Sequence, residues 1–417
     1  MQQQETMVSE RKLKQIKTGS EDRISTLPDE ILQHLISFLP AKEAVQTCLL
    51  VAKGWCHLWK SMPVLRIIAD EWQNEQDVKK LNMFMKNLLL KRNDSAPLDV
   101  CEVRIGEYVD YEGDPRVDSL IRNALLHKAR IIRVTLTSEY NWADLDGLPL
   151  ISLHLTRLEL THMDLRDDVL DYSSCPALKN LVMRGCYIIH SRKISSQTLE
   201  ELTIIDCTFD PCDRTQISAP NLVRLELADF DGATPMIEGM PSLIKATIRL
   251  YGSEDVCGKE EFKGTCSIVR CHNCGTLSNE DFNRHSVLIK GLSEAESLEL
   301  VAECRAFIFK RDLLWCPTFS KLKTLVLNEW CVAIDSRPLI CILQHTPALE
   351  TLILKLGQAP DYWDEMEGTY DGKSAQPLAS KKLKVVKVHY EELDMWVLNI
   401  VKIVKSHLGT EEVKERR

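Results

Sequence analysis

A short leucine pattern, L-x-x-L-x-L, recurs along most of the chain and restricts the possible folds more than any other feature. Four regular copies begin at Leu155, Leu178, Leu199 and Leu222, at intervals of 23, 21 and 23 residues. Looser copies begin at Leu98, Ile131, Leu243, Ala295, Leu322, Leu349 and Leu383. One such unit cannot bury its apolar face alone, so neighbouring units are expected to stack and share one core.

Spacings of about 20 to 29 residues with this motif are typical of leucine-rich repeats, in which each unit gives one strand to a curved parallel sheet. We predict roughly nine to eleven such strands. Side chains alternate along a strand, so the first, fourth and sixth motif positions should face the core, and the third, fifth and seventh the concave, solvent side. The predicted fold class is therefore α/β, with a leucine-rich-repeat solenoid over residues 98–356.

The ninth position of each repeat should lie in the turn beneath the strand, where the motif takes Asn or Cys because a small polar group or thiol fits there. Cys186 and Cys207 occupy this position. Met163, Phe230 and Trp330 replace it with bulkier side chains.

A second informative stretch, residues 22–59, precedes the repeats and predicts three short helices. Pro28 suits the first turn of a helix, because its missing N–H would be unpaired there anyway. Pro40 should end this helix, a second should begin at Ala41, and Gly54 should separate it from a third. A unit of about forty residues is marginal alone, so we expect it to bury its remaining apolar surface against a partner or the following domain.

The blocks LPDEIL, SFLP, AKEAVQTCLL, VAKGW and LW in this stretch closely resemble the F-box of plant F-box proteins with leucine-rich repeats. The resemblance implies docking on a Skp-type adaptor and, through it, on a cullin. The residues that match the family's adaptor contacts are Leu27, Pro28, Ile31, Leu32, Leu39, Val45, Trp55 and Trp59. Some of them must also build the core of the three helices, so they cannot all be contacts.

The chain is expected to divide into six segments. They are a disordered tail (1–21), an F-box (22–66), a helical linker (67–97), the repeats (98–356), an acidic loop (357–380) and a terminal strand and helix (381–417). The last segment resembles the C-terminal FBD element of many plant F-box proteins, although residues 411–417 are charged where the family tends to continue into an apolar strand. We expect the terminal helix to cap the open end of the solenoid.

The balance of charges excludes some partners. With 52 Lys and Arg against 61 Asp and Glu, the formal charge is −9, which gives no general attraction to nucleic acid or to anionic membranes. No apolar run approaches the roughly 18 to 20 residues of a membrane span, and no signal peptide is recognisable. We therefore expect a protein of the nucleus or cytoplasm whose 15 cysteines are reduced.

The sequence contains an incomplete metal-binding motif and no recognised catalytic motif. Cys257, Cys266, Cys271 and Cys274 fall in one stretch where the repeat lapses, but they contain a single CxxC pair, so we expect no metal there. Phosphate-binding glycine loops, HExxH and GxSxG are absent from the sequence. The sequence therefore predicts no catalytic residues and no cofactor.

The resemblance implies a non-catalytic substrate receptor of a Skp–cullin–F-box ubiquitin ligase, in which the repeats bind an unidentified protein and other subunits transfer ubiquitin. A scaffold that uses the same two surfaces without degradation is the alternative, and a receptor for zinc or a small molecule is a third hypothesis. Nothing in the sequence separates the first two.

Four arginines at concave positions are the candidate substrate contacts: Arg157, Arg184, Arg224 and Arg249. We expect them to form a ladder across the sheet, interrupted by Glu159 and Glu226, that suits an acidic or phosphorylated segment, because Arg grips carboxylate and phosphate bidentately. The alternative is a solvated face on which Arg and Glu pair across strands for less than about 1 kcal/mol each.

Overall fold

The computed structural model describes residues 23–51, 53–70, 75–93, 95–106, 116–137, 143–145, 149–165, 170–189, 191–211, 213–251, 286–303, 307–332, 337–357, 382–408 and 413–416. The predicted tail, the four cysteines at 257–274 and residues 358–380 of the predicted acidic loop lie outside them. In the described part of the chain, no helix is long and apolar enough to cross a membrane.

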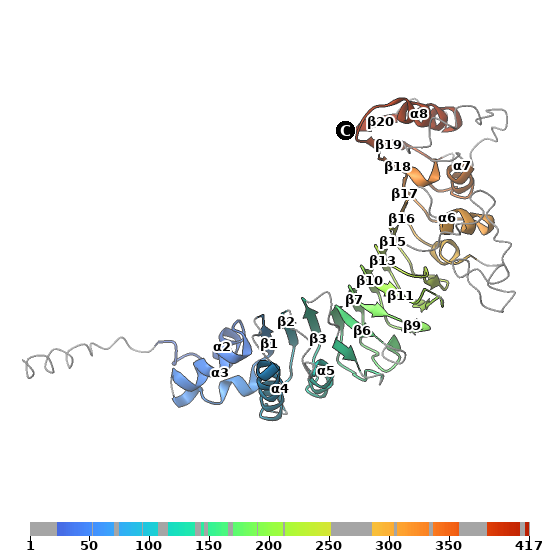
Figure 1. The fold of residues 1–417 in the computed structure, drawn as a ribbon. Coiled ribbons are helices and arrows are strands. Elements are labelled where there is room, and N and C mark those ends of the chain that lie inside the picture. Colours follow the sequence, from blue (N-terminus) through green and yellow to red (C-terminus); the bar gives the residue numbers. More distant parts are fainter. Residues whose placement is uncertain are drawn as a thin grey trace, which may run out of the picture.

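One curved, parallel sheet of thirteen strands runs from the N-terminal module to the C-terminus (Figure 1). Apart from the smaller sheets described below, consecutive strands are neighbours, in the order β1 Val64–Ala69, β2 Val100–Ile105, β3 Ile131–Leu136, β5 Arg157–Thr161, β7 Asn180–Arg184, β10 Glu201–Ile205, β13 Arg224–Ala228, β15 Lys245–Leu250, β16 Ser297–Ala302, β17 Thr324–Asn328, β18 Thr351–Leu356, β19 Val385–Tyr390 and β20 Val413–Arg416. Each predicted leucine motif leads into one of these strands, so the solenoid is confirmed.

Burial alternates along the strands as predicted. In β5, Leu158 and Leu160 are fully buried, while Arg157 and Glu159 between and beside them are partly exposed. The buried leucines of neighbouring repeats belong to one continuous apolar core that extends from the N-terminal helices to the end of the chain. A strand that slipped by one residue would turn these leucines to solvent, so the leucine pattern fixes the register.

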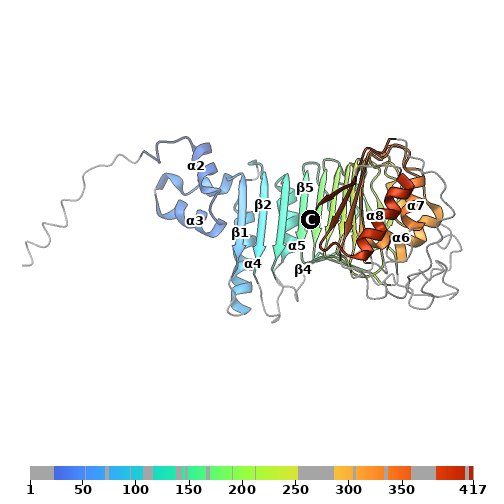
Figure 2. The same cartoon turned by 90° about the horizontal axis from the view of Figure 1, so that it is seen from above.

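The convex side of the sheet carries helices at both ends and short strands in the middle (Figures 1 and 2). The helices are α4 Glu75–Leu90, α5 Val117–Leu126, α6 Phe307–Asp312, α7 Arg337–Gln344 and α8 Met395–Leu408. The short strands form two smaller sheets, β4 Ala143–Leu145 with β6 Met163–Leu165, β8 Tyr187–Ile188 and β11 Thr208–Phe209, and β9 Lys193–Ser195 with β12 Gln216–Ser218 and β14 Met236–Ile237.

The turn beneath each strand depends on two motif positions. The eighth position has a positive φ in the four regular repeats, at His162, Gly185, Asp206 and Asp229, which reverses the chain direction after the strand. The ninth position is buried in every case, and the Cys186 thiol donates to the Leu160 carbonyl at 3.5 Å.

A bulky ninth residue can replace the thiol. Trp330 is fully buried, and its indole Nε1–H donates to the Leu300 carbonyl at 3.0 Å. This bond joins the turn to the strand of the preceding repeat, as the bond from Cys186 to Leu160 does in the second regular repeat. The ninth position therefore needs a donor or sufficient apolar volume, and Met163 and Phe230 provide the volume.

The N-terminal module contains α2 Asp29–Ile36 and α3 Ala41–Leu50, as predicted. The predicted third helix takes the form of two short 3₁₀ turns, η1 Lys53–Trp55 and η2 Leu58–Ser61. Runs this short favour the i→i+3 pattern at connections between elements. The second turn leads directly into β1.

Both ends of the sheet extend beyond the predicted repeats. Strand β1 pairs with β2 in parallel, so the sheet begins before the segment that was expected to be a linker, and α4 within that segment lies on the convex side (Figure 1). At the other end, β20 pairs with β19 in parallel. The predicted C-terminal helix is present as α8, which buries Trp396 and Ile400 in the shared core, and the strand that follows it, β20, forms the edge of the sheet.

Candidate functional site

Helix α2 presents an apolar stripe to solvent. Leu27, Ile31, Leu35 and Phe38 follow helical spacing and are all exposed, and we call these four residues the α2 stripe. Ile31, for example, is 48% exposed. A second exposed apolar segment, Leu49 to Val51, ends α3, where Leu50 is 83% exposed. Contiguous apolar side chains on the surface are typical of a protein interaction site.

The opposite face of α2 builds the core of the N-terminal module. Leu32 is 2% exposed, and Ile36 one turn later is equally buried. Trp55 and Trp59 pack into the same core. The helix is therefore apolar on two faces, one of which is covered by the protein itself and one of which is not.

The structure thus divides the eight predicted adaptor contacts into three groups. Leu27, Pro28 and Ile31 are exposed; Leu39 and Val45 are half-buried against the core; and Leu32, Trp55 and Trp59 are buried. Sequence reasoning missed five exposed apolar residues, Leu35, Phe38, Leu49, Leu50 and Val51. The spacing of four residues from Leu27 to Ile31 to Leu35 was the signal that could have identified the stripe.

Polar contacts fix the start of α2 against the 3₁₀ turns. The Trp55 indole N–H donates to the Ser25 hydroxyl at 3.0 Å, and His57 Nε2 lies 3.1 Å from an Asp29 carboxylate oxygen. These two contacts join segments about thirty residues apart in the sequence. They position the chain that leads into the α2 stripe.

The connection between the N-terminal module and the sheet is held by the loop after α4. The Arg92 guanidinium donates to the Met62 carbonyl at 2.6 Å and to the Pro97 carbonyl at 3.0 Å, and Arg92 is only 6% exposed. Burial lowers the pKa of Arg92 to about 10, so it is still a cation at neutral pH. The Asn93 N–H also donates to the Lys60 carbonyl at 2.9 Å. The connection is therefore a hydrogen-bonded part of the fold.

Arg66 of β1 makes a second link between the module and the sheet. Its guanidinium donates to the Ser37 carbonyl at the end of α2 and to the Glu102 carboxylate at 3.2 Å. The guanidinium carbon also lies 5.9 Å from the centre of the Phe38 ring. A cation at a helix C-terminus satisfies the carbonyls left open there, so Arg66 fixes both α2 and the last residue of the stripe.

The predicted arginine ladder on the concave face is wrong in its geometry. Strand register places Arg157 and Arg224 in one row, with Asn180 and Glu201 between them. Arg184 belongs to a different row, four positions along the strand. Arg249 shares that second row and is separated from Arg184 by Ile205 and Ala228. The four side chains therefore do not form one contiguous surface.

Three of the four arginines also have carboxylate partners. Arg224 pairs with Glu201, Arg249 with Glu226 at 2.8 Å, and Arg157 shares Glu159 with Arg133. Partial burial alone would raise the pKa of Glu159, but hydrogen bonds from Arg133 and Arg157 outweigh it and leave this pKa below its usual value. Among the described residues, no carboxylate pairs with Arg184, whose side chain is exposed.

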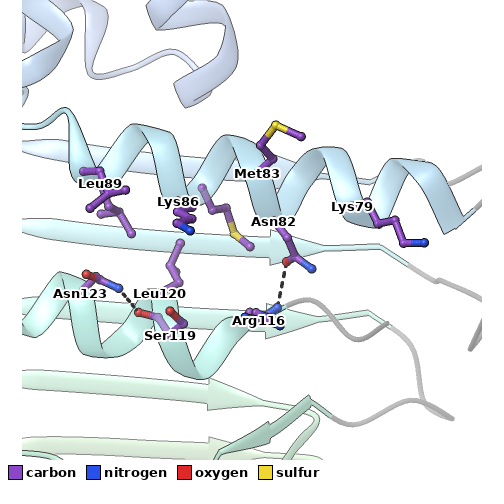
Figure 3. Close-up of a pocket in the computed structure, with 11 residues that line it drawn as sticks. Lys79, Asn82, Met83, Lys86, Leu89, Arg116, Ser119, Leu120 and Asn123 are labelled. Carbon is purple, nitrogen blue, oxygen red and sulfur yellow. Dashed lines mark hydrogen bonds between the residues drawn. The ribbon is translucent and has the colours of Figure 1, made fainter. Parts of the chain in front are cut away.

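The described part of the chain also has hollows outside these surfaces. A groove of about 610 Å³ between α4 and α5 is lined by Lys79, Lys86 and Arg116, and the Arg116 backbone N–H donates to the Asn82 side chain at 3.0 Å (Figure 3). A shallower hollow of about 330 Å³ at the C-terminal ends of the strands is lined by Tyr251, Lys355, Glu329, His389 and Tyr390, among others. Aromatic, cationic and anionic groups thus meet at that end of the sheet.

Comparison with known proteins agrees with the fold. The F-box domain model matches residues 24–67. An F-box/LRR-repeat protein of Arabidopsis thaliana is 30% identical over 259 residues, which cover 55% of this chain and 82% of the relative. Another is 28% identical over 384 residues, covering 81% and 92%, and an F-box/FBD/LRR-repeat protein of the same plant is 26% identical over 378 residues, covering 82% and 78%.

The fold and its surfaces define a class of interaction protein in which a small helical docking module is joined to a repeat solenoid. The chain belongs to the plant F-box/LRR-repeat family, with FBD-like features at its C-terminus.

Proposed function

We propose that this protein is the substrate-recognition subunit of a Skp–cullin–F-box ubiquitin ligase. The observation that carries the proposal is the α2 stripe, an unpartnered apolar surface within the residues that match the F-box domain. The F-box binds the Skp-type adaptor, which in turn binds a cullin, and the repeats bind the target protein. Neither the matched domain nor the relatives reported above are named as enzymes, so ubiquitin transfer is assigned to other subunits.

The rigid connection between the two surfaces supports this role. Arg66, Arg92 and Asn93 hold the F-box on the first strands of the sheet, so a target on the repeats has a defined position relative to the adaptor. Fixing two sites in one body raises the effective concentration of one bound partner near the other. In a ligase, this would keep a target lysine close to the conjugating enzyme.

The docking assignment is tested with the purified full chain and a Skp-type adaptor. Ile31→Ala with Leu35→Ala removes two residues of the α2 stripe and should weaken adaptor binding at least about tenfold, because central apolar contacts carry most of the energy of an interface. Leu126→Ala is the matched control, since Leu126 is an exposed leucine at the C-terminal end of α5, outside the F-box. Unchanged affinity of the double variant, with native thermal stability, would disprove the docking surface.

The non-degradative scaffold remains the second candidate, because it uses the same two surfaces. Co-purification distinguishes the two roles. A ligase subunit should recover a cullin together with the adaptor, and its bound target should become shorter-lived when the chain is present. A scaffold should recover the adaptor and target with no change in target lifetime.

We place the target on the concave face, near Arg184 and the hollow between Tyr251 and Tyr390. Arg184 is the member of the four arginines that has no carboxylate partner among the described residues, so binding an acidic group there breaks no existing ion pair. Arginine binds carboxylate or phosphate bidentately, which favours an acidic or phosphorylated segment.

A further inference from the structure

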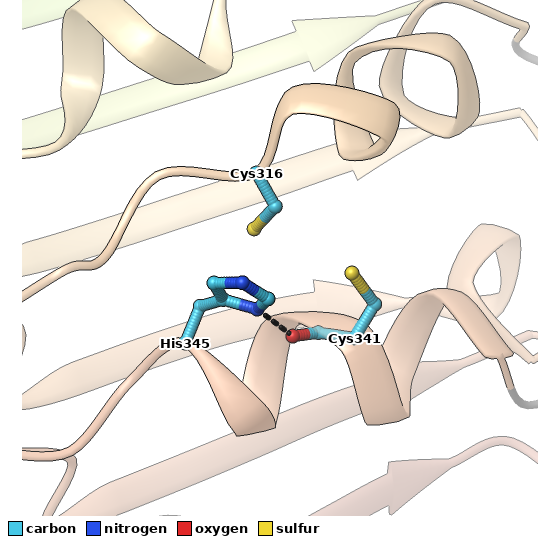
Figure 4. Close-up of side chains that lie close together, drawn as sticks. All are labelled: Cys316, Cys341 and His345. Carbon is cyan, nitrogen blue, oxygen red and sulfur yellow. Dashed lines mark hydrogen bonds between the residues drawn. The ribbon is translucent and has the colours of Figure 1, made fainter.

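Two thiols and one imidazole meet on the convex side of the C-terminal repeats. Cys316 follows the 3₁₀ turn η7 Leu313–Trp315, Cys341 lies in α7, and His345 directly follows that helix. The two sulfur atoms and a ring nitrogen all lie within 4.8 Å of one another (Figure 4). Cys341 and His345 are four residues apart, a spacing that places both on one face of a helix.

The imidazole is held in the orientation that a metal ligand needs. His345 Nδ1 lies 2.8 Å from the Cys341 carbonyl oxygen, so Nδ1–H is the donor in this bond. The proton is then on Nδ1, which leaves the lone pair of Nε2 unprotonated and available. Metal-binding histidines typically hold their second nitrogen in this way, often against a backbone carbonyl.

The chemistry and the geometry of the cluster agree with zinc. Zn²⁺ takes thiolate and imidazole ligands at about 2.3 and 2.0 Å, which places ligand atoms of a tetrahedral site roughly 3.5 to 3.8 Å apart. The three atoms here need to approach one another by only about one ångström, which a side-chain rotation can supply. All three residues are partly exposed, so an ion can reach them.

Another thiol pair in the described residues shows what a structural pair looks like. Cys186 and Cys207 are also adjacent, since the Cys186 N–H donates to the Cys207 sulfur at 3.4 Å. Both are fully buried, and their thiols donate to backbone carbonyls within the strand turns. The cluster at Cys316 differs because it adds a histidine and is accessible to solvent.

We propose that Cys316, Cys341 and His345 form a three-ligand zinc site whose fourth position is open to water or another exchangeable ligand. Each thiol gives its proton to solvent as the metal binds, so affinity should fall as the pH is lowered. The bound ion would join η7 to α7 across consecutive repeats and so stiffen the C-terminal part of the solenoid. The site is separate from the proposed adaptor and target surfaces.

Cobalt provides the probe, because a tetrahedral thiolate site gives Co²⁺ visible d–d bands and a thiolate-to-metal charge-transfer band. The full chain is prepared reduced and metal-free, with Cys257, Cys266, Cys271 and Cys274 all changed to Ser to remove the other cysteine-rich stretch. We expect both bands to saturate at one Co²⁺ per chain and to disappear when zinc is added. Cys341→Ser should abolish the charge-transfer band, and His345→Gln should weaken binding roughly tenfold or more.

The matched control is Cys56→Ser, because Cys56 is an exposed thiol in the F-box, and its cobalt spectrum should be unchanged. Circular dichroism melting confirms that each variant is folded. If Cys341→Ser does not fold, His345→Gln serves as the test. Absence of the bands in the four-serine chain would overturn the proposal, as would their persistence in both ligand variants. A Cys316–Cys341 disulfide in protein purified under cytosol-like reducing conditions, detected by peptide mass, would overturn it as well.

Discussion

The F-box and the repeats expose surfaces of opposite character. The F-box leaves apolar side chains uncovered along α2, whereas the concave face of the sheet carries charges that largely pair with one another. Apolar surface gives affinity wherever it is buried, while charged surface selects partners and speeds association. In the proposed ligase subunit, the apolar surface would serve the constant adaptor and the charged surface would discriminate among targets.

The sharpest test of this contrast lies within one helix. Leu32→Ala should lower the free energy of unfolding by about 2 to 5 kcal/mol, because it leaves a cavity in the core of the F-box. Ile31→Ala, one residue away, should leave stability within about 0.5 kcal/mol while weakening adaptor binding. Urea unfolding and adaptor titration of both variants measure the two effects. Equal loss of stability would show that the α2 stripe belongs to the core.

A second test separates the F-box from the sheet. Arg92→Met keeps an unbranched apolar stem but removes the donors to the Met62 and Pro97 carbonyls, which should cost about 2 to 3 kcal/mol of stability. The matched control is Lys91→Met, because Lys91 is an exposed neighbour. Thermal unfolding is followed by Trp fluorescence, to which Trp55 and Trp59 of the F-box contribute together with the other six tryptophans. An Arg92 variant as stable as the control would argue against a rigid connection.

A third test compares paired and unpaired arginines on the concave face. Arg224→Glu places two carboxylates side by side at Glu201 and should cost about 0.5 to 1 kcal/mol, with a small effect on target capture. Arg184→Glu breaks no ion pair in the described residues, so stability should change by about 0.5 kcal/mol or less while target capture is lost. Pull-down with each variant measures how much target is captured. If capture depends on Arg224 and not on Arg184, the target binds at the row that contains Arg157 and Arg224.

The smallest expected effect is on the loss of folding stability at low pH. The folded-state pKa of Glu159 is lowered, so its ion pairs with Arg133 and Arg157 stabilise the fold above the ordinary Glu pKa, and this contribution is lost as the pH falls through the folded-state value. Glu159→Gln should therefore reduce the acid-induced loss of stability by less than about 1 kcal/mol. Urea unfolding at neutral pH and near pH 3 checks this, and an equal acid loss in both proteins would contradict it.

The leucine motif predicted the sheet well because the leucines of the motif are the buried residues of each strand. Leu158 and Leu160 alternate with charged residues, and no other register buries both. The strand after the terminal helix was missed for the opposite reason. Strand β20 is almost entirely charged and is recognisable only by its backbone pairing with β19. Strand β1, a single short strand without the leucine motif, was expected as an extended exit from the F-box and not as a member of the sheet.

The candidate sites were less predictable. Ile31 and Leu32 are both apolar and lie on adjacent positions of one helix, so composition could not say which of them the protein covers itself. The arginine rows could have been recognised, because Arg157 and Arg224 occupy the third motif position and Arg184 and Arg249 the seventh. The residues of the proposed zinc site could not, since Cys316 and Cys341 come from different repeats and only the folded chain brings them together.

Strand β1 has a consequence for how the molecule can be divided. It is the exit from the F-box and also the first strand of the sheet, so its loss would leave β2 as a new edge with open N–H and C=O groups. An uncovered, apolar edge of this kind is a template for pairing with another chain. A fragment that began at the first leucine motif, Leu98, is therefore expected to associate with itself. In this chain the F-box therefore leads into the strand that pairs with β2 at the N-terminal end of the solenoid.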